Sequence, residues 1–176
     1  MYKLTFGLVA VLLAGCGSSG GDAGSKPAGS GAPSGGAASG NGSTAVVELT
    51  PLPLKITVAK GGMGAMDMSI GDSKSVTVDI GGGASLNVSE GDKDFAAVKK
   101  SYEGDTILFP FKKWAKQDAT MAIAQFENSG KTGFIGMTMK DVGGKKYVCK
   151  TTGLDGVASA ELAEKHLKTC DTLAAK

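Results

Sequence analysis

The chain has 176 residues, of which 41% are hydrophobic and 20% are charged, so it carries enough apolar side chains for a packed globular domain. Its 19 basic residues are all lysines and stand against 17 acidic residues, which leaves a formal net charge of +2. Arginine is the side chain best suited to bidentate contacts with phosphate and guanine. A nearly neutral chain without arginine therefore argues against nucleic-acid recognition.

The N-terminal segment has the layout of an export signal. Met1-Tyr2-Lys3 supplies a positive charge, and residues 4–13 form an apolar run that is too short to span a bilayer. The run ends in Leu13-Ala14-Gly15-Cys16. This order of charge, apolar run, small residues and cysteine resembles the lipobox of bacterial lipoproteins, which signal peptidase II cuts before the cysteine.

The resemblance implies that residues 1–15 are a signal peptide and that Cys16 is the lipid attachment site, carrying a diacylglyceryl group and an N-linked acyl chain such as palmitate. Three acyl chains hold a protein to a membrane essentially permanently. Many such lipoproteins stay in the inner membrane when an Asp follows the cysteine, and here that residue is Gly17. We therefore expect anchoring in the cell outer membrane, facing the periplasm or the cell exterior.

Residues 16–44 are expected to be a flexible, lipid-anchored linker. The segment from Gly17 to Thr44 holds ten glycines among Ser, Ala and Pro, and it lacks Leu, Ile, Val and aromatic residues. Such a composition does not bury enough apolar surface to offset the entropy of ordering. As a random coil of these 28 residues it spans a root-mean-square distance of about 30 Å. Residues 45–176 then form a single globular domain.

Apolar and polar residues alternate along the first half of this domain, which predicts half-buried strands. Glycine-rich turns separate the strands and favour antiparallel hairpins. The alternating apolar positions are Leu54, Ile56 and Val58; Met66, Met68 and Ile70; Val76, Val78 and Ile80; and Leu86 and Val88. A helix is expected over residues 92–103, capped by Asp92 or Asp94 and ended by Gly104.

The second half repeats this scheme. Strands are expected near residues 120–127, 133–140 and 145–151, followed by a helix over about 159–174. The pattern predicts an α+β fold in which two helices pack on one face of an antiparallel sheet. Cys149 and Cys170 are the two cysteines left after lipidation, and in an oxidising compartment they should form a disulfide that links the C-terminal helix to the last strand. The wide spacing of the two cysteines does not favour the alternative, a redox dithiol.

The aromatic group Phe109, Phe111 and Trp114 falls in the least regular part of the domain and is flanked by lysines. These rings are a candidate contact surface for another component of the cell envelope. The alternative is that they cap one end of the core, because aromatic side chains bury large apolar areas.

These observations favour a binding or scaffolding module for an envelope protein or polymer, without a cofactor and without enzymatic activity. Catalysis needs at least two groups held within reach of each other, and His166 is the only histidine. Carboxylates such as Asp67, Asp79 and Glu90 could still meet in space, so a hydrolase of envelope polymers is one alternative.

A copper-handling lipoprotein is the second alternative. Thioethers are soft ligands that suit Cu(I), and six methionines lie in or near expected strands. Met66 and Met68, however, share parity with Ile70, which is the pattern of apolar packing positions. The methionines concerned are Met63, Met66, Met68, Met121, Met137 and Met139.

Cys16→Ser should abolish lipid labelling and move the protein from the detergent phase to the aqueous phase. The domain should stay folded, because the flexible linker separates the anchor from the core. Metabolic labelling with a fatty-acid analogue and detergent partitioning measure both effects. Wild-type protein that is exported free of lipid would contradict the assignment of Cys16.

Overall fold

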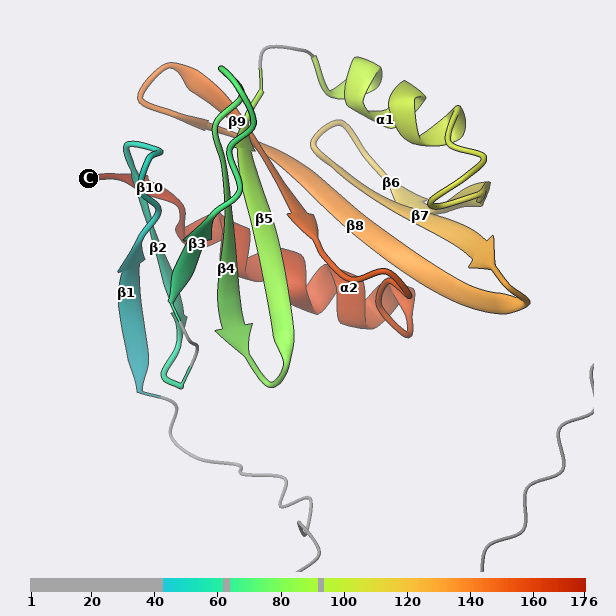
Figure 1. Ribbon diagram of the computed structural model, residues 1–176, viewed down its shortest axis with the longest axis horizontal. Coiled ribbons are helices and arrows are strands. Elements are labelled where there is room, and N and C mark those ends of the chain that lie inside the picture. The colour runs from blue at the N-terminus through green and yellow to red at the C-terminus, as the bar shows by residue number, and fades with distance from the viewer. Residues whose placement is uncertain (1–42, 62–63, 92–93) are drawn as a thin grey trace, which may run out of the picture. The chain divides into compact units, whose positions relative to one another are not determined.

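The computed structural model describes residues 43–61, 64–91 and 94–176, which form two antiparallel sheets and two α-helices (Figure 1). The smaller sheet has the order β1-β2-β10 and the larger sheet has the order β3-β4-β5-β9-β8-β7-β6. The strands are β1 (Thr44–Glu48), β2 (Leu54–Ala59), β3 (Ala65–Asp67), β4 (Ser75–Gly81), β5 (Ala84–Glu90), β6 (Phe111–Gln117), β7 (Met121–Asn128), β8 (Lys131–Val142), β9 (Lys145–Thr151) and β10 (Ala174–Ala175). The helices are α1 (Phe95–Glu103), α2 (Ala160–Leu167) and the 3-10 helix η1 (Lys168–Thr172).

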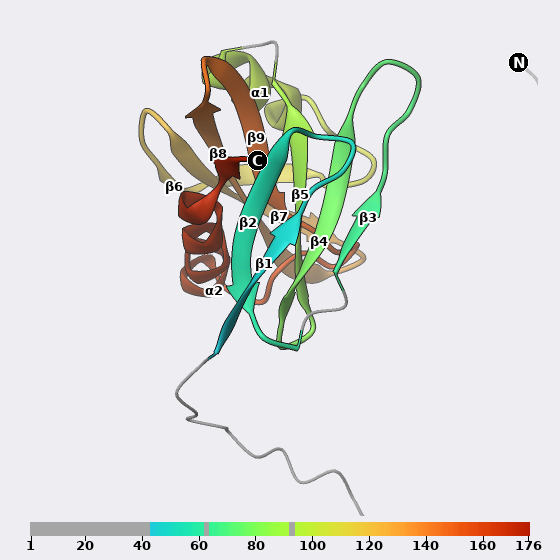
Figure 2. The same cartoon turned by 90° about the vertical axis from the view of Figure 1, so that its left-hand side faces the viewer.

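The main core lies between the two sheets. Inward positions of β4, β5 and β9 are almost fully buried beneath the smaller sheet, and Figure 2 shows β1 and β2 in front of the larger sheet. The alternation predicted for residues 54–58, 76–80 and 86–88 supplies most of this core. Its buried members are Leu49, Leu52, Leu54, Ile56, Val58, Val76, Val78, Ile80, Leu86, Val88, Tyr147, Cys149, Leu167 and Cys170.

Helix α2 packs on this same face of the larger sheet. The helix begins after Ser159, whose Oγ accepts a hydrogen bond from the backbone N–H of Leu162 at 3.2 Å. A Cβ atom at Gly136 of β8 would lie 2.9 Å from Leu167 Cδ1 and 3.3 Å from Ala163 Cβ. The glycine therefore lets α2 lie directly against the backbone of β8.

Helix α1 packs on the opposite face of the larger sheet. Phe95 of α1 joins a second cluster that contains Ile135 and Met137 of β8. Successive residues of a strand point to opposite faces, so Met137 beneath α1 and Gly136 beneath α2 place the two helices on opposite sides. The views agree in keeping the helices apart (Figures 1 and 2). Neither helix within the described ranges is long and apolar enough to cross a membrane.

The expectation that both helices pack on one face is therefore wrong, although the coarser prediction of an antiparallel sheet with two helices is confirmed. The reason lies in β7 and β8, whose side chains are buried on both faces. Ile123 of β7 packs with α2, whereas its neighbours Ala122 and Ala124 pack with α1. Strands with two buried faces give each helix its own docking surface.

Several elements differ from the sequence-based expectations at the edges of the sheets. β1 and β6 were not predicted; β6 pairs with β7 through two register shifts, which break the period of two. Met66 and Met68 have the parity of core residues but are 66% and 49% exposed, because β3 is an edge strand that nothing covers on that face. The C-terminal helix ends at Leu167 and continues as η1 and β10.

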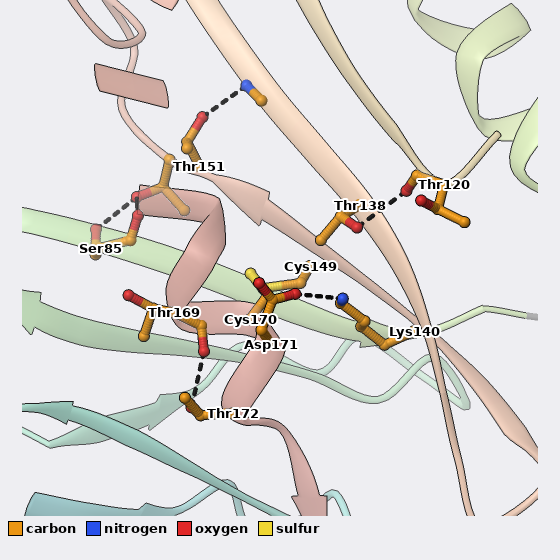
Figure 3. Close-up of a disulfide and its surroundings, with 12 residues drawn as sticks. Ser85, Thr120, Thr138, Lys140, Cys149, Thr151, Thr169, Cys170, Asp171 and Thr172 are labelled. Atoms are coloured by element: carbon orange, nitrogen blue, oxygen red, sulfur yellow. Dashed lines mark hydrogen bonds and ion pairs between the residues drawn. A yellow bond between two sulfur atoms is a disulfide. The ribbon is translucent and has the colours of Figure 1, made fainter. Parts of the chain in front are cut away.

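The predicted disulfide between Cys149 and Cys170 is present and joins β9 to η1 (Figure 3). Both cysteines are fully buried, and their Cα atoms are 6.3 Å apart. The next residue, Asp171, forms an ion pair with Lys140 of β8. Thr172 Oγ1 accepts a hydrogen bond from the backbone N–H of Thr57 at 2.9 Å. The C-terminal segment is thus fastened to both sheets.

Replacing both Cys149 and Cys170 by Ala should lower the free energy of unfolding by about 3 kcal/mol, because the disulfide closes a loop of 21 residues in the unfolded chain. Denaturant unfolding of the two proteins measures the difference. Membrane attachment should not change. Alkylation of both thiols in unreduced, exported wild-type protein would contradict the pairing.

Candidate functional site

The face of β3, β4, β5 and β9 that points away from the smaller sheet carries a straight row of side chains. Lys150 of β9 is paired with Asn87 of β5, Asn87 with Thr77 of β4, and Thr77 with Met66 of β3. Directly paired residues of antiparallel strands have their side chains on the same face. The row therefore crosses the four strands at right angles and forms the floor of a groove.

Three hollows lie side by side over this floor, and we call them together the sheet groove. The α1 hollow has a volume of about 410 Å³, the central hollow about 470 Å³ and the β3 hollow about 490 Å³. The first two share Tyr102, Phe109 and Lys150, and the last two share Met68 and Thr77. The shared residues make the hollows one continuous depression from α1 to β3.

The wall near α1 is held in place by polar contacts at the end of that helix. The carboxylate of Asp105 accepts hydrogen bonds from the backbone N–H groups of Ile107 and Leu108, both at 3.0 Å. These bonds hold the pKa of Asp105 below its usual range. The turn that they form presents Phe109 to the groove, and the edge of its ring packs on Phe126, with centroids 5.1 Å apart.

Small polar side chains of the floor bond to one another. Asn87 Nδ2 donates to Ser75 Oγ at 2.7 Å and to Thr77 Oγ1 at 3.2 Å. Ser69, beyond β3, accepts a hydrogen bond from the backbone N–H of Ser75 at 3.2 Å. Much of the hydrogen-bonding capacity of the floor is therefore used within the protein, which leaves a smooth surface of small side chains.

Lys150 differs from its neighbours on the floor because its ammonium group has no hydrogen-bond or ion-pair partner among the described residues. Burial lowers the pKa of Lys150, since removal from water disfavours the charged form. Tyr102 lines the same two hollows, and its hydroxyl group likewise has no described partner. Burial and the charge of Asp105 raise the pKa of Tyr102 to about 12, so its hydroxyl stays a neutral donor.

The structure does not present Phe109, Phe111 and Trp114 as one contact surface at the groove. All three rings pack against the cluster beneath α1, and the Phe111 and Trp114 ring centroids are 5.0 Å apart. Trp114 Nε1 donates to Glu103 Oε1 at 2.8 Å, which ties β6 to the end of α1. Only Phe109 of these three lines the groove. Cys16 lies outside the described residues.

The carboxylates considered for hydrolysis do not form a pair. Asp67 is partnered with Val76 and points to the face of the sheet opposite the groove, whereas Asp79 lines the β3 hollow. Glu90 lies at the α1 end of β5 and is paired with Tyr147, so its side chain also points away from the groove. His166 lies in a separate depression with the β4–β5 turn, and burial lowers its pKa. The described residues contain no group of three His, Cys, Asp or Glu side chains that could hold a metal ion.

The candidate copper ligands are also distributed over the fold. Met66 and Met68 line the groove, and Met137 and Met139 pack beneath α1. Met121 contacts the cluster beneath α2, on the other face of the sheet. Met63 lies outside the described residues.

No protein-family model, curated protein or solved structure matched the chain in our comparisons. The assignment of a function therefore depends on the sheet groove. What this arrangement offers is a preformed depression with one cation and one phenol, which are donors for an anionic or strongly accepting group of a ligand.

The alternation of residues did not reveal the groove because polar positions of a strand usually face solvent. One signal was present in the sequence. The outward positions of β4 and β5 are mainly the small residues Ser75, Thr77, Asn87 and Ser89, whereas a freely solvated sheet face commonly carries long charged side chains. A polar strand face made of small residues indicates a covered or occupied surface.

Lys150→Met should leave the protein at least as stable as the wild type at neutral pH, because it removes a partly buried and unpaired charge. In the wild type this destabilisation is fully present below the folded pKa of Lys150 and disappears as the pH rises toward 10.5, the ordinary value. The stability difference between variant and wild type should therefore shrink with increasing pH. Denaturant unfolding at a series of pH values measures this difference. A variant that is less stable than the wild type by the same amount at every pH would contradict the prediction.

Proposed function

We propose that this protein is a lipid-anchored lipoprotein of the outer membrane whose domain binds a ligand in the sheet groove and does not catalyse a reaction. The observation that carries the proposal is the continuous groove with the unpartnered Lys150 in its floor. An unpaired ammonium group in a partly buried position costs stability, and such costs are concentrated at functional sites.

The separation of the acidic groups and the histidine supports binding rather than catalysis. General acid–base or nucleophilic catalysis requires two groups within hydrogen-bond reach of one another or of a common substrate atom. Asp79 lies in the β3 hollow, the side chain of Glu90 points to the other face of the sheet, and His166 lines a different depression. Lys150 and Tyr102 at the centre are both suited to donating hydrogen bonds to a bound group.

The proposed anchor fits a role in ligand capture near a membrane. A linker of the length given by residues 16–44 would keep the domain within a few tens of ångströms of the bilayer, about 30 Å by the coil estimate. At this distance the domain meets molecules that leave or enter the membrane at a high effective concentration.

Filling the groove should abolish binding without unfolding the domain. Thr77→Trp places a large ring on the floor where the central and β3 hollows meet, whereas Thr132→Trp makes the same change on an exposed part of β8 outside the groove. A ligand at about a hundred times its dissociation constant stabilises a protein by about 2.7 kcal/mol, enough to raise the melting temperature by several degrees. Thermal unfolding with fractions of a cell-envelope extract measures this shift.

At least one fraction should raise the melting temperature of the wild type and of Thr132→Trp, but not that of Thr77→Trp. Fractions that raise all three equally, or none that raises the wild type, would contradict the groove as the binding site. Turnover of esters or peptidoglycan fragments that is lost in His166→Ala would contradict the absence of catalysis.

A further inference from the structure

The distribution of charge along the sheet groove separates its three hollows. Among the described residues, Lys150 is the only charged one that lines the central hollow. Acidic residues lie nearer the two ends, Asp105 in the α1 hollow and Asp79 in the β3 hollow. The positive charge of the groove therefore lies at its centre, where it attracts an anionic group.

The chemistry of the central hollow favours a carboxylate as the anion. The ammonium group of Lys150 and the hydroxyl group of Tyr102 are two donors there that make no hydrogen bond among the described residues. A carboxylate has two oxygens that accept one bond from each. A phosphate group carries more charge and more acceptors than these two donors match, and arginine, which suits it best, is absent from the chain.

The other half of the groove suits an apolar chain. The β3 hollow and its junction with the central hollow are lined by Ala65, Met66, Met68 and Ala84, and most of the surface there is carbon. Met66 and Met68 are far more exposed than core methionines. Methionine is a common lining residue of sites that bind flexible apolar ligands. Leu154, which is 80% exposed, lies at the rim of the central hollow. Apolar side chains thus gather at the β3 end and the rim of the groove, while the floor between Lys150 and Met66 carries Asn87 and Thr77.

We propose that the sheet groove binds a fatty acid, with the carboxylate at Lys150 and Tyr102 and the acyl chain lying across β5 and β4 to Met66 and Met68 on the β3 side. This inference rests on the proposed binding function and names the ligand class. From β9 to β3 the groove crosses three strand spacings, or about 14 Å at about 4.8 Å each.

A carbohydrate ligand fits the same walls less well. Sugar-binding sites stack exposed aromatic faces on the sugar rings, whereas Phe109 already packs on Phe126 and Tyr102 is largely buried. On the floor, the amide group of Asn87 donates to the hydroxyl oxygens of Ser75 and Thr77. An acyl chain needs no donors from the floor, so this network stays intact when the chain binds.

Laurate labelled with carbon-13 at its carboxyl group tests the proposal on the full-length lipoprotein in phosphatidylcholine nanodiscs, with empty nanodiscs as the blank. Lys150→Met should weaken laurate binding by about ten- to a hundredfold, the range for a lost hydrogen bond to a charged group. Tyr102→Phe should weaken it by about five-fold. Lys145→Met is the matched control, because Lys145 is an exposed lysine of the same strand whose side chain points to the other face. Its affinity should equal that of the wild type.

Two comparisons among ligands separate the contribution of the carboxylate to the affinity from that of the acyl chain. Laurate should bind at least about a hundredfold more tightly than hexanoate, because each buried methylene contributes about fourfold. Methyl laurate, which has no charge, should bind wild type and Lys150→Met equally. Met66→Asp should weaken laurate and leave hexanoate almost unchanged.

Laurate affinity in the wild type should fall as the pH rises toward 10.5, the ordinary pKa of lysine, because burial lowers the pKa of Lys150 and deprotonation removes the counter-charge. The titratable groups that line these hollows with Lys150 are Tyr102, whose pKa is raised to about 12, and Asp105, whose pKa is held below its usual range. The side chain of Glu90, which is paired with Tyr147, points to the other face of the sheet. The phenol of Tyr102 keeps its proton through this range, and the carboxyl group of Asp105 stays ionised. Lys150→Met should therefore show no such fall.

Equal laurate affinity in wild type and Lys150→Met, or hexanoate binding as tightly as laurate, would overturn the fatty-acid proposal. If laurate does not bind but an envelope fraction still stabilises the wild type and not Thr77→Trp, the groove is a binding site for another ligand class and only this inference fails. If no fraction acts on the groove, the proposed function fails as well.

Discussion

The central constraint on this fold is that β4, β5 and β9 each have one apolar face, and that this face is completely covered. The smaller sheet, α2 and η1 all pack on it, which commits the C-terminal segment to one side of the larger sheet. Of the two described α-helices, α1 packs on the other face of the larger sheet. It covers the half of that face formed by β6, β7 and β8. The sheet groove is the remaining uncovered half of that face.

Strand β9 connects the stability of the domain with its candidate site, because neighbouring residues of the strand serve the two faces. Cys149 points into the core and forms the disulfide, while Lys150 points into the groove. The covalent link to η1 and the pairing with both β5 and β8 hold the backbone of Lys150 in place. A rigid strand therefore presents a charge that the rest of the fold does not neutralise, as a preorganised binding site requires.

Much of the core could be predicted from the sequence, because alternation identifies a strand whenever one face is buried and the other is polar. It succeeded for Val76, Val78, Leu86 and Val88, and the disulfide followed from the number of cysteines. The same rule failed for Met66, where the parity of a core residue occurs on an uncovered edge strand, and for β6, where register shifts interrupt the period. The groove depends on pairing between distant strands, so Lys150 could not be placed beside Asn87 and Thr77 from local patterns. The lipid on Cys16 stays a prediction.

The direction of the groove has a consequence for selectivity. A ligand that lies across strands, rather than along one, is measured in steps of one strand spacing, about 4.8 Å. The row from Lys150 to Met66 begins at the ammonium group and ends at an edge strand of only three residues. The distance between these two ends sets the length of ligand that the groove accepts. Edge strands tolerate extension, loss or replacement more readily than central ones. Descendants of this chain could therefore change the length of ligand they accept by altering β3, while the recognition of the charged end stays fixed in β9.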